Sequence, residues 1–396
     1  MKKYFLLIGL FIISILSIAA IPAKWIGFSV NHNTECADES FSNDDRDIKK
    51  EFQVKAGGKL NLELNSGASI TAEGWDKELV SVEVQFGGRD ADNVEFEFRQ
   101  NGNDVTVESN YKEKRRNNSA NIKVLVMMPQ KYNVEFTTTG GSVSFKKVDG
   151  EFEGTTMGGS IDLSNVKGKA EMKTMGGSIS VKSCDLDGKV ETMGGSIDID
   201  DLIGNLDLST MGGSIKQNNV RERNDSSGKE VTISTMGGSI EVDQALNGAR
   251  VKTMGGPITV NKAAKFVEAE TMGGGIEIKE IDGRVKATTM GGDIEVKMVG
   301  DPNQGDRNVF LKSMGGDIYL TVPANLSMDV DIEIGYTKDH DVKIESDFDL
   351  KQEREVVKKD SDRNRKKYLL GTGIINGGKN KIKIQTNGGD VYLKKS

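Results

Sequence analysis

A four-residue motif, Thr-Met-Gly-Gly, recurs through the middle of the chain and constrains the fold more than any other feature. Met precedes a glycine pair nine times, and six of the eight spacings are 18 residues. The other two spacings, 25 and 24, add polar insertions at 218–228 and 300–308. A fixed period of this length is typical of a fold that stacks one small unit on the next. The nine methionines are Met157, Met175, Met193, Met211, Met236, Met254, Met272, Met290 and Met314.

Apolar and polar residues alternate on both sides of each glycine pair. Ile161-Asp162-Leu163 follows the first pair, and apolar residues stand three and five positions before most of the methionines. Alternation with a period of two predicts a half-buried strand, whereas a helix would need apolar residues three and four apart. One unit cannot bury its apolar side alone, but stacked units can. The sequence therefore predicts an all-β, single-chain β-solenoid, similar to a parallel β-helix, with turns of about 18 residues.

The glycine pairs are expected to form one corner of every turn. Glycine adopts the positive φ that tight corners need, so we expect this role for both glycines of each pair. The return corner is expected to be looser and often contains Asp-Gly or Asn-Gly, as at Asp187-Gly188. The predicted corner residues are Gly158, Gly159, Gly176, Gly177, Gly194, Gly195, Gly212, Gly213, Gly237, Gly238, Gly255, Gly256, Gly273, Gly274, Gly291, Gly292, Gly315 and Gly316.

The flanks of the repeat array predict further segments. Residues 1–23 combine a short basic start with an apolar run, which indicates a signal peptide or an N-terminal anchor. Residues 24–50 are expected to be a polar linker, and 51–130 a β segment that caps the first turn. The regular solenoid is expected at 131–322 and an irregular C-terminal solenoid and cap at 323–396. Within the last segment, the charge-dense run 351–367 is expected to be a solvated loop. The chain is accordingly expected to be exported to the periplasm, the cell surface or the medium.

Composition excludes several classes of function. The net charge of −7 is spread along the chain, which argues against nucleic acid or an anionic membrane surface as the main partner. The membrane would be contacted only through the N-terminal segment, if that segment stays uncleaved. Only two cysteines, Cys36 and Cys184, and two histidines, His32 and His340, are present. Both thiols are expected to be unpaired, and no motif indicates a catalytic site, a metal site or a cofactor.

Three rows of equivalent residues run through the repeats. Strand alternation predicts that the threonines of the motif point inward and bond the corner backbone. The carboxylates after the glycine pairs are expected to form a solvated polar face. Calcium-binding β-rolls need a glycine where this chain has Ile161, so a calcium site is not expected. These carboxylates are Asp162, Asp198, Glu241, Glu277 and Glu295, interrupted by Ser180, Lys216 and Thr259.

The methionine row leaves three interpretations open. Strand alternation directs these side chains away from the core. The glycine pair that follows can, however, reverse the side to which they point. The favoured interpretation is that Met fills an irregular gap at the corner, since its side chain adapts to such gaps. The alternatives are an apolar stripe for a partner and a thioether array for a soft metal.

Three segments together resemble a known family. Leu60-Asn61-Leu62 leads to Gly74-Trp75-Asp76, and the run 122–129 leads to Phe136 and the first glycine pair. The last segment is Gly388-Gly389-Asp390-Val391-Tyr392-Leu393. Over residues 50–396 the chain resembles the bacterial putative-adhesin family of secreted β-strand-repeat proteins. The resemblance implies an all-β, solenoid-like domain at the bacterial envelope, without established chemistry.

These observations predict a non-catalytic exported envelope protein, structural or adhesin-like, that presents a repeated β surface. Its expected partner is an envelope protein or a surface glycan of unknown identity. One alternative is an envelope sensor or scaffold that binds a protein through the polar insertions. The other is a carbohydrate-active β-helix enzyme that works through carboxylates, although an active site should interrupt the repeat with special residues.

Overall fold

The computed structural model describes residues 46–113, 120–221, 230–337, 341–357 and 367–396. The expected signal peptide, most of the expected linker, Cys36, His32 and His340 lie outside these ranges. Within them the chain forms thirty strands and a single short 3₁₀ turn at Ala91–Asn93. None of the helical segments in these ranges is long and apolar enough to cross a membrane. The all-β prediction is confirmed.

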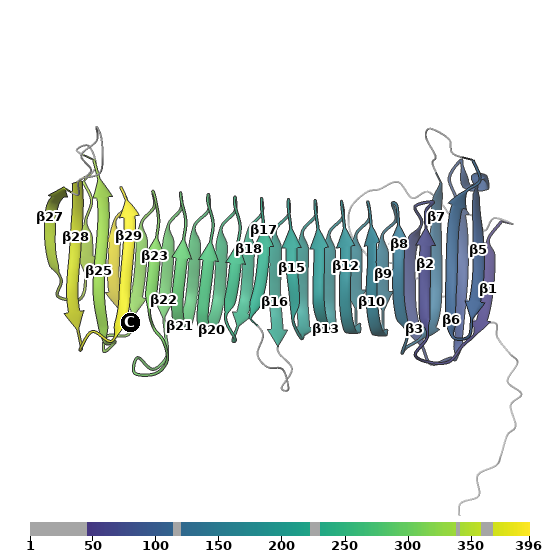
Figure 1. Ribbon diagram of the computed structural model, residues 1–396, viewed down its shortest axis with the longest axis horizontal. Coiled ribbons are helices and arrows are strands. Elements are labelled where there is room, and N and C mark those ends of the chain that lie inside the picture. Colours follow the sequence, from purple (N-terminus) through teal and green to yellow (C-terminus); the bar gives the residue numbers. More distant parts are fainter. Residues whose placement is uncertain (1–45, 114–119, 222–229, 338–340, 358–366) are drawn as a thin grey trace, which may run out of the picture. The chain divides into compact units, whose positions relative to one another are not determined.

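Regular turns of strands form the middle of the chain. We call β8 to β24, together with β29 and β30, the stack (Figure 1). These strands are β8 (Asn133–Thr138), β9 (Val143–Lys146), β10 (Asp149–Thr156), β11 (Ile161–Ser164), β12 (Lys167–Thr174), β13 (Ile179–Thr192), β14 (Ile197–Ile203), β15 (Leu206–Thr210), β16 (Ile215–Arg221), β17 (Val231–Thr235), β18 (Ile240–Ala245), β19 (Ala249–Lys252), β20 (Ile258–Glu270), β21 (Ile276–Thr288), β22 (Ile294–Met298), β23 (Val309–Lys312), β24 (Ile318–Val322), β29 (Asn380–Asn387) and β30 (Val391–Lys395).

Parallel pairing joins equivalent positions of successive turns. Phe152 pairs with Ala170, 18 residues later, and Ile161 pairs with Ile179. The ladder keeps its register past both insertions. The partner of Leu208 is Ile233, and the insertion 300–308 likewise falls between β22 and β23. The insertions therefore leave the stack at its return corner, without shifting the strands.

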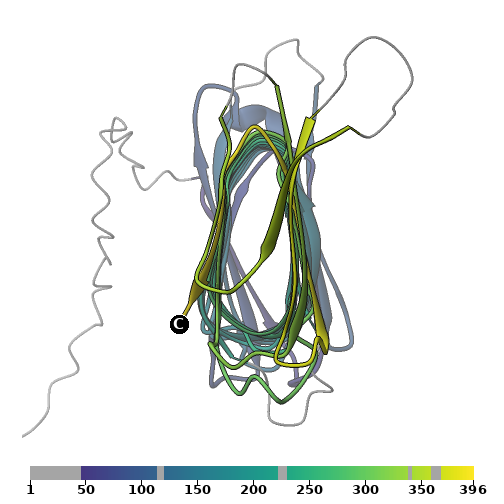
Figure 2. The same cartoon turned by 90° about the vertical axis from the view of Figure 1, so that its left-hand side faces the viewer.

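The core lies between the two strand layers of the stack, which Figure 2 shows as the long sides of each turn. In β11, Ile161 and Leu163 are buried, whereas Asp162 between them is exposed. Each fully buried Ile or Leu contributes about 1.5–3 kcal/mol. Since equivalent positions stack directly, the apolar residues of all turns form one continuous core.

At the N-terminal end, seven strands of the described ranges precede the stack and cover its first turn. β2 and β3 lie against the first regular turn, with Leu60 paired to Val134 and Ile70 paired to Val143. β6 and β7 then cover β2 and β3 from the outside, and antiparallel pairs with β1, β4 and β5 complete this end. These strands are β1 (Ile48–Gln53), β2 (Lys59–Leu64), β3 (Ser69–Trp75), β4 (Leu79–Gly87), β5 (Val94–Asn101), β6 (Asp104–Tyr111) and β7 (Asn121–Pro129). The first strand thus begins within the last residues of the expected linker.

The C-terminal end has the same interleaved path. β29 and β30 lie directly on β23 and β24, while β25 pairs with the far side of β29. β27 and β28 continue outward as antiparallel strands. The remaining strands are β25 (Met328–Tyr336), β26 (Ile344–Ser346), β27 (Lys351–Val357) and β28 (Lys367–Ile375). The prediction of a loop at 351–367 was wrong for 351–357, because pairing with β28 supplies hydrogen bonds that charge density does not reveal. Residues 358–366 lie outside the described ranges.

Candidate functional site

The glycine pairs are required by the close approach of neighbouring turns rather than by their φ angles. A Cβ on Gly195 would lie 2.3 Å from the carbonyl O of Gly177, its equivalent in the preceding turn. A Cβ on Gly194 would lie 3.2 Å from the carbonyl O of Gly176. All eighteen predicted corner glycines lie in the described ranges, and none has a φ in the left-handed region. The expected positive φ was therefore wrong for this corner.

Positive φ angles occur instead at the return corner, on glycines and on other residues alike. Short polar side chains tolerate this conformation best, and Asn and Asp are among those found there. The residues with positive φ at this corner include Lys147, Asn165, Ser183, Asp201 and Asn219, spaced 18 apart. Gly188, expected in a loose return turn, has positive φ, and so does Gly248.

The threonines of the motif point inward, as predicted. The Thr192 Oγ1 donates a hydrogen bond to the carbonyl O of Gly177 at 2.6 Å and accepts one from the amide N of Gly195 at 3.2 Å. One hydroxyl thus joins two turns and satisfies two backbone groups of the corner. The same bond to the preceding turn is made by Thr156, Thr174, Thr210, Thr235, Thr253, Thr271 and Thr289, and by Ser313.

The methionines of the motif point outward, so the favoured corner-filling interpretation was wrong. Their exposed fractions range from 39% at Met193 to 54% at Met157. Since Thr occupies the inward position, the next residue faces solvent by simple strand alternation. Backbone bonds keep the row in register, as between the amide N of Gly212 and the carbonyl O of Met193 at 3.1 Å. We call this row of nine residues the methionine ladder.

The carboxylates after the glycine pairs lie on the outer face of the strands that follow them. Asp162 pairs in register with Ser180, and Asp198 pairs with Lys216. Lys216 also approaches Glu241, with 3.6 Å between Nζ and Oε2. No group of three or more His, Cys, Asp or Glu side chains in the described ranges could hold a metal ion. The row is accordingly a mixed polar face.

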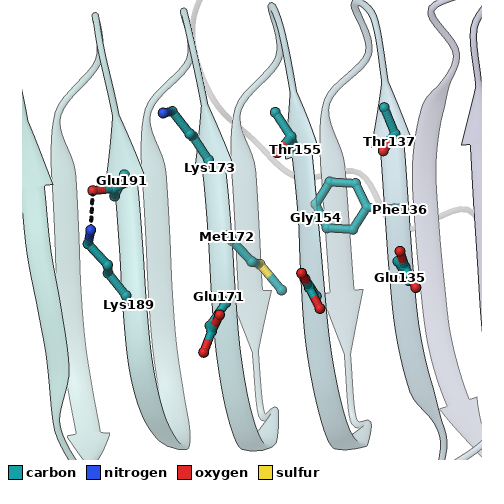
Figure 3. Close-up of a pocket in the computed structure, with 11 residues that line it drawn as sticks. Glu135, Phe136, Thr137, Gly154, Thr155, Glu171, Met172, Lys173, Lys189 and Glu191 are labelled. Carbon is teal, nitrogen blue, oxygen red and sulfur yellow. Dashed lines mark ion pairs between the residues drawn. The ribbon is translucent and has the colours of Figure 1, made fainter.

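A shallow open groove of about 300 Å³ lies on the outer face of the strands before the glycine pairs (Figure 3). Several of its charged side chains form ion pairs. Lys189 Nζ lies 2.5 Å from Glu191 Oε1, and the hydrogen bond to Glu191 raises the pKa of Lys189. Likewise, the hydrogen bond from Lys169, 2.6 Å away, lowers the pKa of Glu171. The lowered pKa keeps Glu171 ionised beside Lys169, which suits contact with a polar ligand better than proton transfer.

The floor of this groove depends on Gly154, whose significance the sequence analysis missed. The ring of Phe136 occupies the space beside Gly154, and a Cβ there would lie 2.4 Å from Cδ1 of the ring. Phe136 also packs edge-to-face against Phe145 at 5.5 Å between ring centroids. A glycine inside a predicted strand signals such a close approach and could have indicated the site.

A second groove, of about 520 Å³, lies on the same face several turns later. Arg250 forms ion pairs with Glu230, at 2.6 Å, and with Glu268. The ring of Phe266 lies between the guanidinium groups of Arg250 and Arg284, 5.2 and 4.8 Å from its centroid. Cation–π contacts of this kind stabilise both arginine side chains beside the ring. Both grooves are therefore lined in part by charged side chains that form ion pairs.

The insertion 300–308 is held in one conformation by Arg307, a residue that the sequence did not single out. Its side chain is almost fully buried, and its guanidinium donates to the carbonyl O atoms of Val299, Asp301 and Gln304 at 2.7–3.0 Å. It also lies 2.5 Å from Asp282 Oδ1. A buried guanidinium bonded to three backbone carbonyl groups fixes a loop, so this insertion presents a defined surface.

Cys184 is a free buried thiol, as expected for an unpaired cysteine. Burial raises the pKa of its thiol, which keeps it protonated and unreactive.

Comparison with known proteins shows what part of the chain is similar to. None of the curated proteins compared with it matches. A solved structure from Clostridium sporogenes, titled as a "putative cell adhesion protein", is 11% identical over 89% of this chain and 100% of that one. Its TM-score is 0.20, a value too low to carry information about fold or function. The family model described as Toastrack DUF4097 matches residues 224–394. This match supports the resemblance to secreted β-strand-repeat proteins of unknown function.

Proposed function

We propose that the protein is a non-catalytic, exported protein of the bacterial envelope that acts like an adhesin, by presenting one repeated β surface to a ligand. In this proposal the fold is a β-solenoid of 18-residue turns with β caps at both ends. Residues 1–23 direct export or anchor the chain. The partner is a surface glycan or an envelope protein.

The observation that carries the proposal is the repetition of one outer surface from turn to turn. Parallel pairing in register places equivalent outward side chains directly above one another along the stack. A ligand with its own repeat, such as a glycan, can contact several turns at once, and each added contact strengthens the attachment. The grooves fit this role because they are open and shallow, and several of their charges form ion pairs.

Deleting whole turns tests the proposal. Removing residues 176–193 joins Met175 to Gly194, which restores the motif and shortens the stack by one turn. Removing 176–211 shortens it by two turns. Beads coated with the chain lacking residues 1–23 are pulled from bacterial envelopes and from a panel of surface glycans. The proposal expects the detachment force to fall stepwise with each turn removed. Coated beads that adhere no better than bare beads to every surface would disprove adhesion.

A second candidate function, an envelope scaffold that binds a protein through the insertion 300–308, is favoured by the fixed conformation that Arg307 gives this loop. Deleting residues 302–307 shortens the spacing between Met290 and Met314 from 24 to 18 residues and leaves the number of turns unchanged. Loss of binding in this variant, together with full binding after deletion of 176–211, would favour the scaffold over the adhesin. Turnover of any glycan in the same panel would instead indicate an enzyme.

A further inference from the structure

The methionine ladder is a row of large apolar side chains that the core does not use. Nine of the twelve large apolar side chains that are exposed in the described ranges belong to it. Leucine or a polar residue would fit an exposed strand position equally well. Packing therefore does not explain why every regular turn has a thioether at this place.

Backbone hydrogen bonds bring the thioethers of neighbouring turns within reach of one another. The amide N of Gly212 donates to the carbonyl O of Met193 at 3.1 Å, and that of Gly237 to the carbonyl O of Met211 at 3.0 Å. Residues in register on neighbouring strands lie about 4.8 Å apart. The unbranched methionine side chain has three rotatable bonds. Sulfur atoms from two or three consecutive turns can therefore converge on a single ion.

We propose that the methionine ladder binds soft monovalent metal ions, Cu(I) or Ag(I), through thioether sulfurs of consecutive turns. Thioethers are soft ligands that favour Cu(I) over hard or borderline cations. With three sulfurs for each ion, nine methionines hold about three ions. Binding requires no electron transfer, because the ion enters as a monovalent cation. It displaces no proton either, because a thioether is neutral.

The surroundings of the ladder suit a cation. The residue that follows the second glycine has no positive charge in any of the nine turns. These residues are Ser160, Ser178, Ser196, Ser214, Ser239, Pro257, Gly275, Asp293 and Asp317. On the other side, the residue before the motif Thr or Ser is Lys in three turns, Glu in two, and Ser or Thr in the other four. One of these lysines, Lys252, lies 3.2 Å from Glu270. Since the described ranges contain no cluster of His, Cys, Asp and Glu ligands, borderline ions such as Zn²⁺ have no competing site there.

Silver titration of the chain lacking residues 1–23 tests the proposal. Ag(I) is the probe because it stays monovalent in air, and chloride is excluded from the buffer. Cys36→Ser and Cys184→Ala are introduced first, since a thiolate would bind Ag(I) itself. NMR of ¹³C-methyl methionine reports on each thioether, and mass spectrometry counts the bound ions. In a variant with Met193→Leu, Met211→Leu and Met236→Leu, the bound silver should fall by about one third.

The expected result is a saturable shift of the nine ladder methyl signals at both pH 5 and pH 7.5, because a thioether does not titrate. Buried methionines are internal controls and should not shift. They are Met128, Met172, Met298 and Met328. The matched variant Met172→Leu should bind as much Ag(I) as the background chain. Cu(I), supplied anaerobically against a chromophoric chelator, should compete for the same signals, and Zn²⁺ should leave them unshifted.

Three results would overturn the proposal: ladder signals that do not move with Ag(I), unchanged silver content in the triple variant, or equal shifts with Zn²⁺. Should the triple variant fail to show a β-sheet circular dichroism spectrum, the single variant Met211→Leu replaces it. In that variant the signals of Met193 and Met236 should shift less than in the background chain. Equal shifts would again contradict coordination across turns.

Discussion

The two glycines of one pair should respond very differently to the same substitution. Gly195→Ala places a methyl group 2.3 Å from the carbonyl O of Gly177, whereas Gly194→Ala places it 3.2 Å from that of Gly176. Ordinary contact needs about 3.4 Å or more. The first variant therefore forces neighbouring backbones apart by about 1 Å, and the second by only a few tenths of an ångström.

The cost of Gly195→Ala has two parts. Forcing a methyl group into a closely packed contact costs about 1–3 kcal/mol. The displaced carbonyl of Gly177 also loses the hydrogen bond from the Thr192 hydroxyl, now 2.6 Å long, which costs about 1–3 kcal/mol for a buried group. We expect a total of about 4 kcal/mol. For Gly194→Ala, mild crowding is offset by the lower entropy of the unfolded chain, which favours Ala by about 0.4–1 kcal/mol, so the net effect should be close to zero.

Amide hydrogen exchange measures this difference turn by turn, which suits a repeat fold whose turns contact mainly their neighbours. About 4 kcal/mol corresponds to roughly a thousandfold faster exchange. In Gly195→Ala this acceleration should appear at Ile179, whose amide bonds the carbonyl O of Ser196 at 2.9 Å. The amide of Ile276, several turns away, should exchange at its original rate. Equal acceleration by both alanine variants would refute the close-approach explanation of the glycine pair.

Further predictions follow from the buried polar groups. Thr192→Val keeps the shape of the side chain but removes the donor to Gly177. It should therefore lower the free energy of local opening at this corner by about 2 kcal/mol, which speeds amide exchange there, whereas Thr192→Ser should not. Arg307→Met should make the insertion 300–308 a preferred site of limited proteolysis, because the carbonyl groups around the guanidinium lose their donor. Burial raises the pKa of Tyr132 to about 12. Since the folded state favours the neutral phenol, this stabilisation is present below pH 10 and is lost as the pH rises towards 12. Denaturation at pH 9 to 12 should show the loss in the natural chain and not in Tyr132→Phe.

The repeat predicted the all-β fold because its two signals, the period of 18 and the alternation within each unit, depend on backbone geometry alone. The direction of the threonines followed from the same alternation and is confirmed. The methionines were misassigned because the glycine pair was expected to reverse the alternation of inward and outward side chains. This alternation in fact continues from the buried Thr192 to the exposed Met193.

Other features had no local signal. The interleaved ends, where β29 fits between β23 and β25, depend on pairings between residues such as Val309 and Ile382, 73 positions apart. The grooves depend on which charged side chains meet across turns, as Arg250 does with Glu268 and Glu230. Periodicity within one turn contains no information about such contacts.

The continuity of the methionine edge has a structural cause that is separate from its chemistry. Both insertions, and the excursions of the chain at both ends, leave the stack at the return corner. The opposite corner cannot accept extra residues, because its backbones already approach too closely for a single methyl group, as at Gly195. Any residue placed before the glycine pair would therefore form an unbroken row. The geometry explains why a row exists, but it does not select a thioether over leucine or serine. The identity of this residue is consequently the feature of the chain that calls for a functional explanation, and metal binding is one that a single substitution series can test.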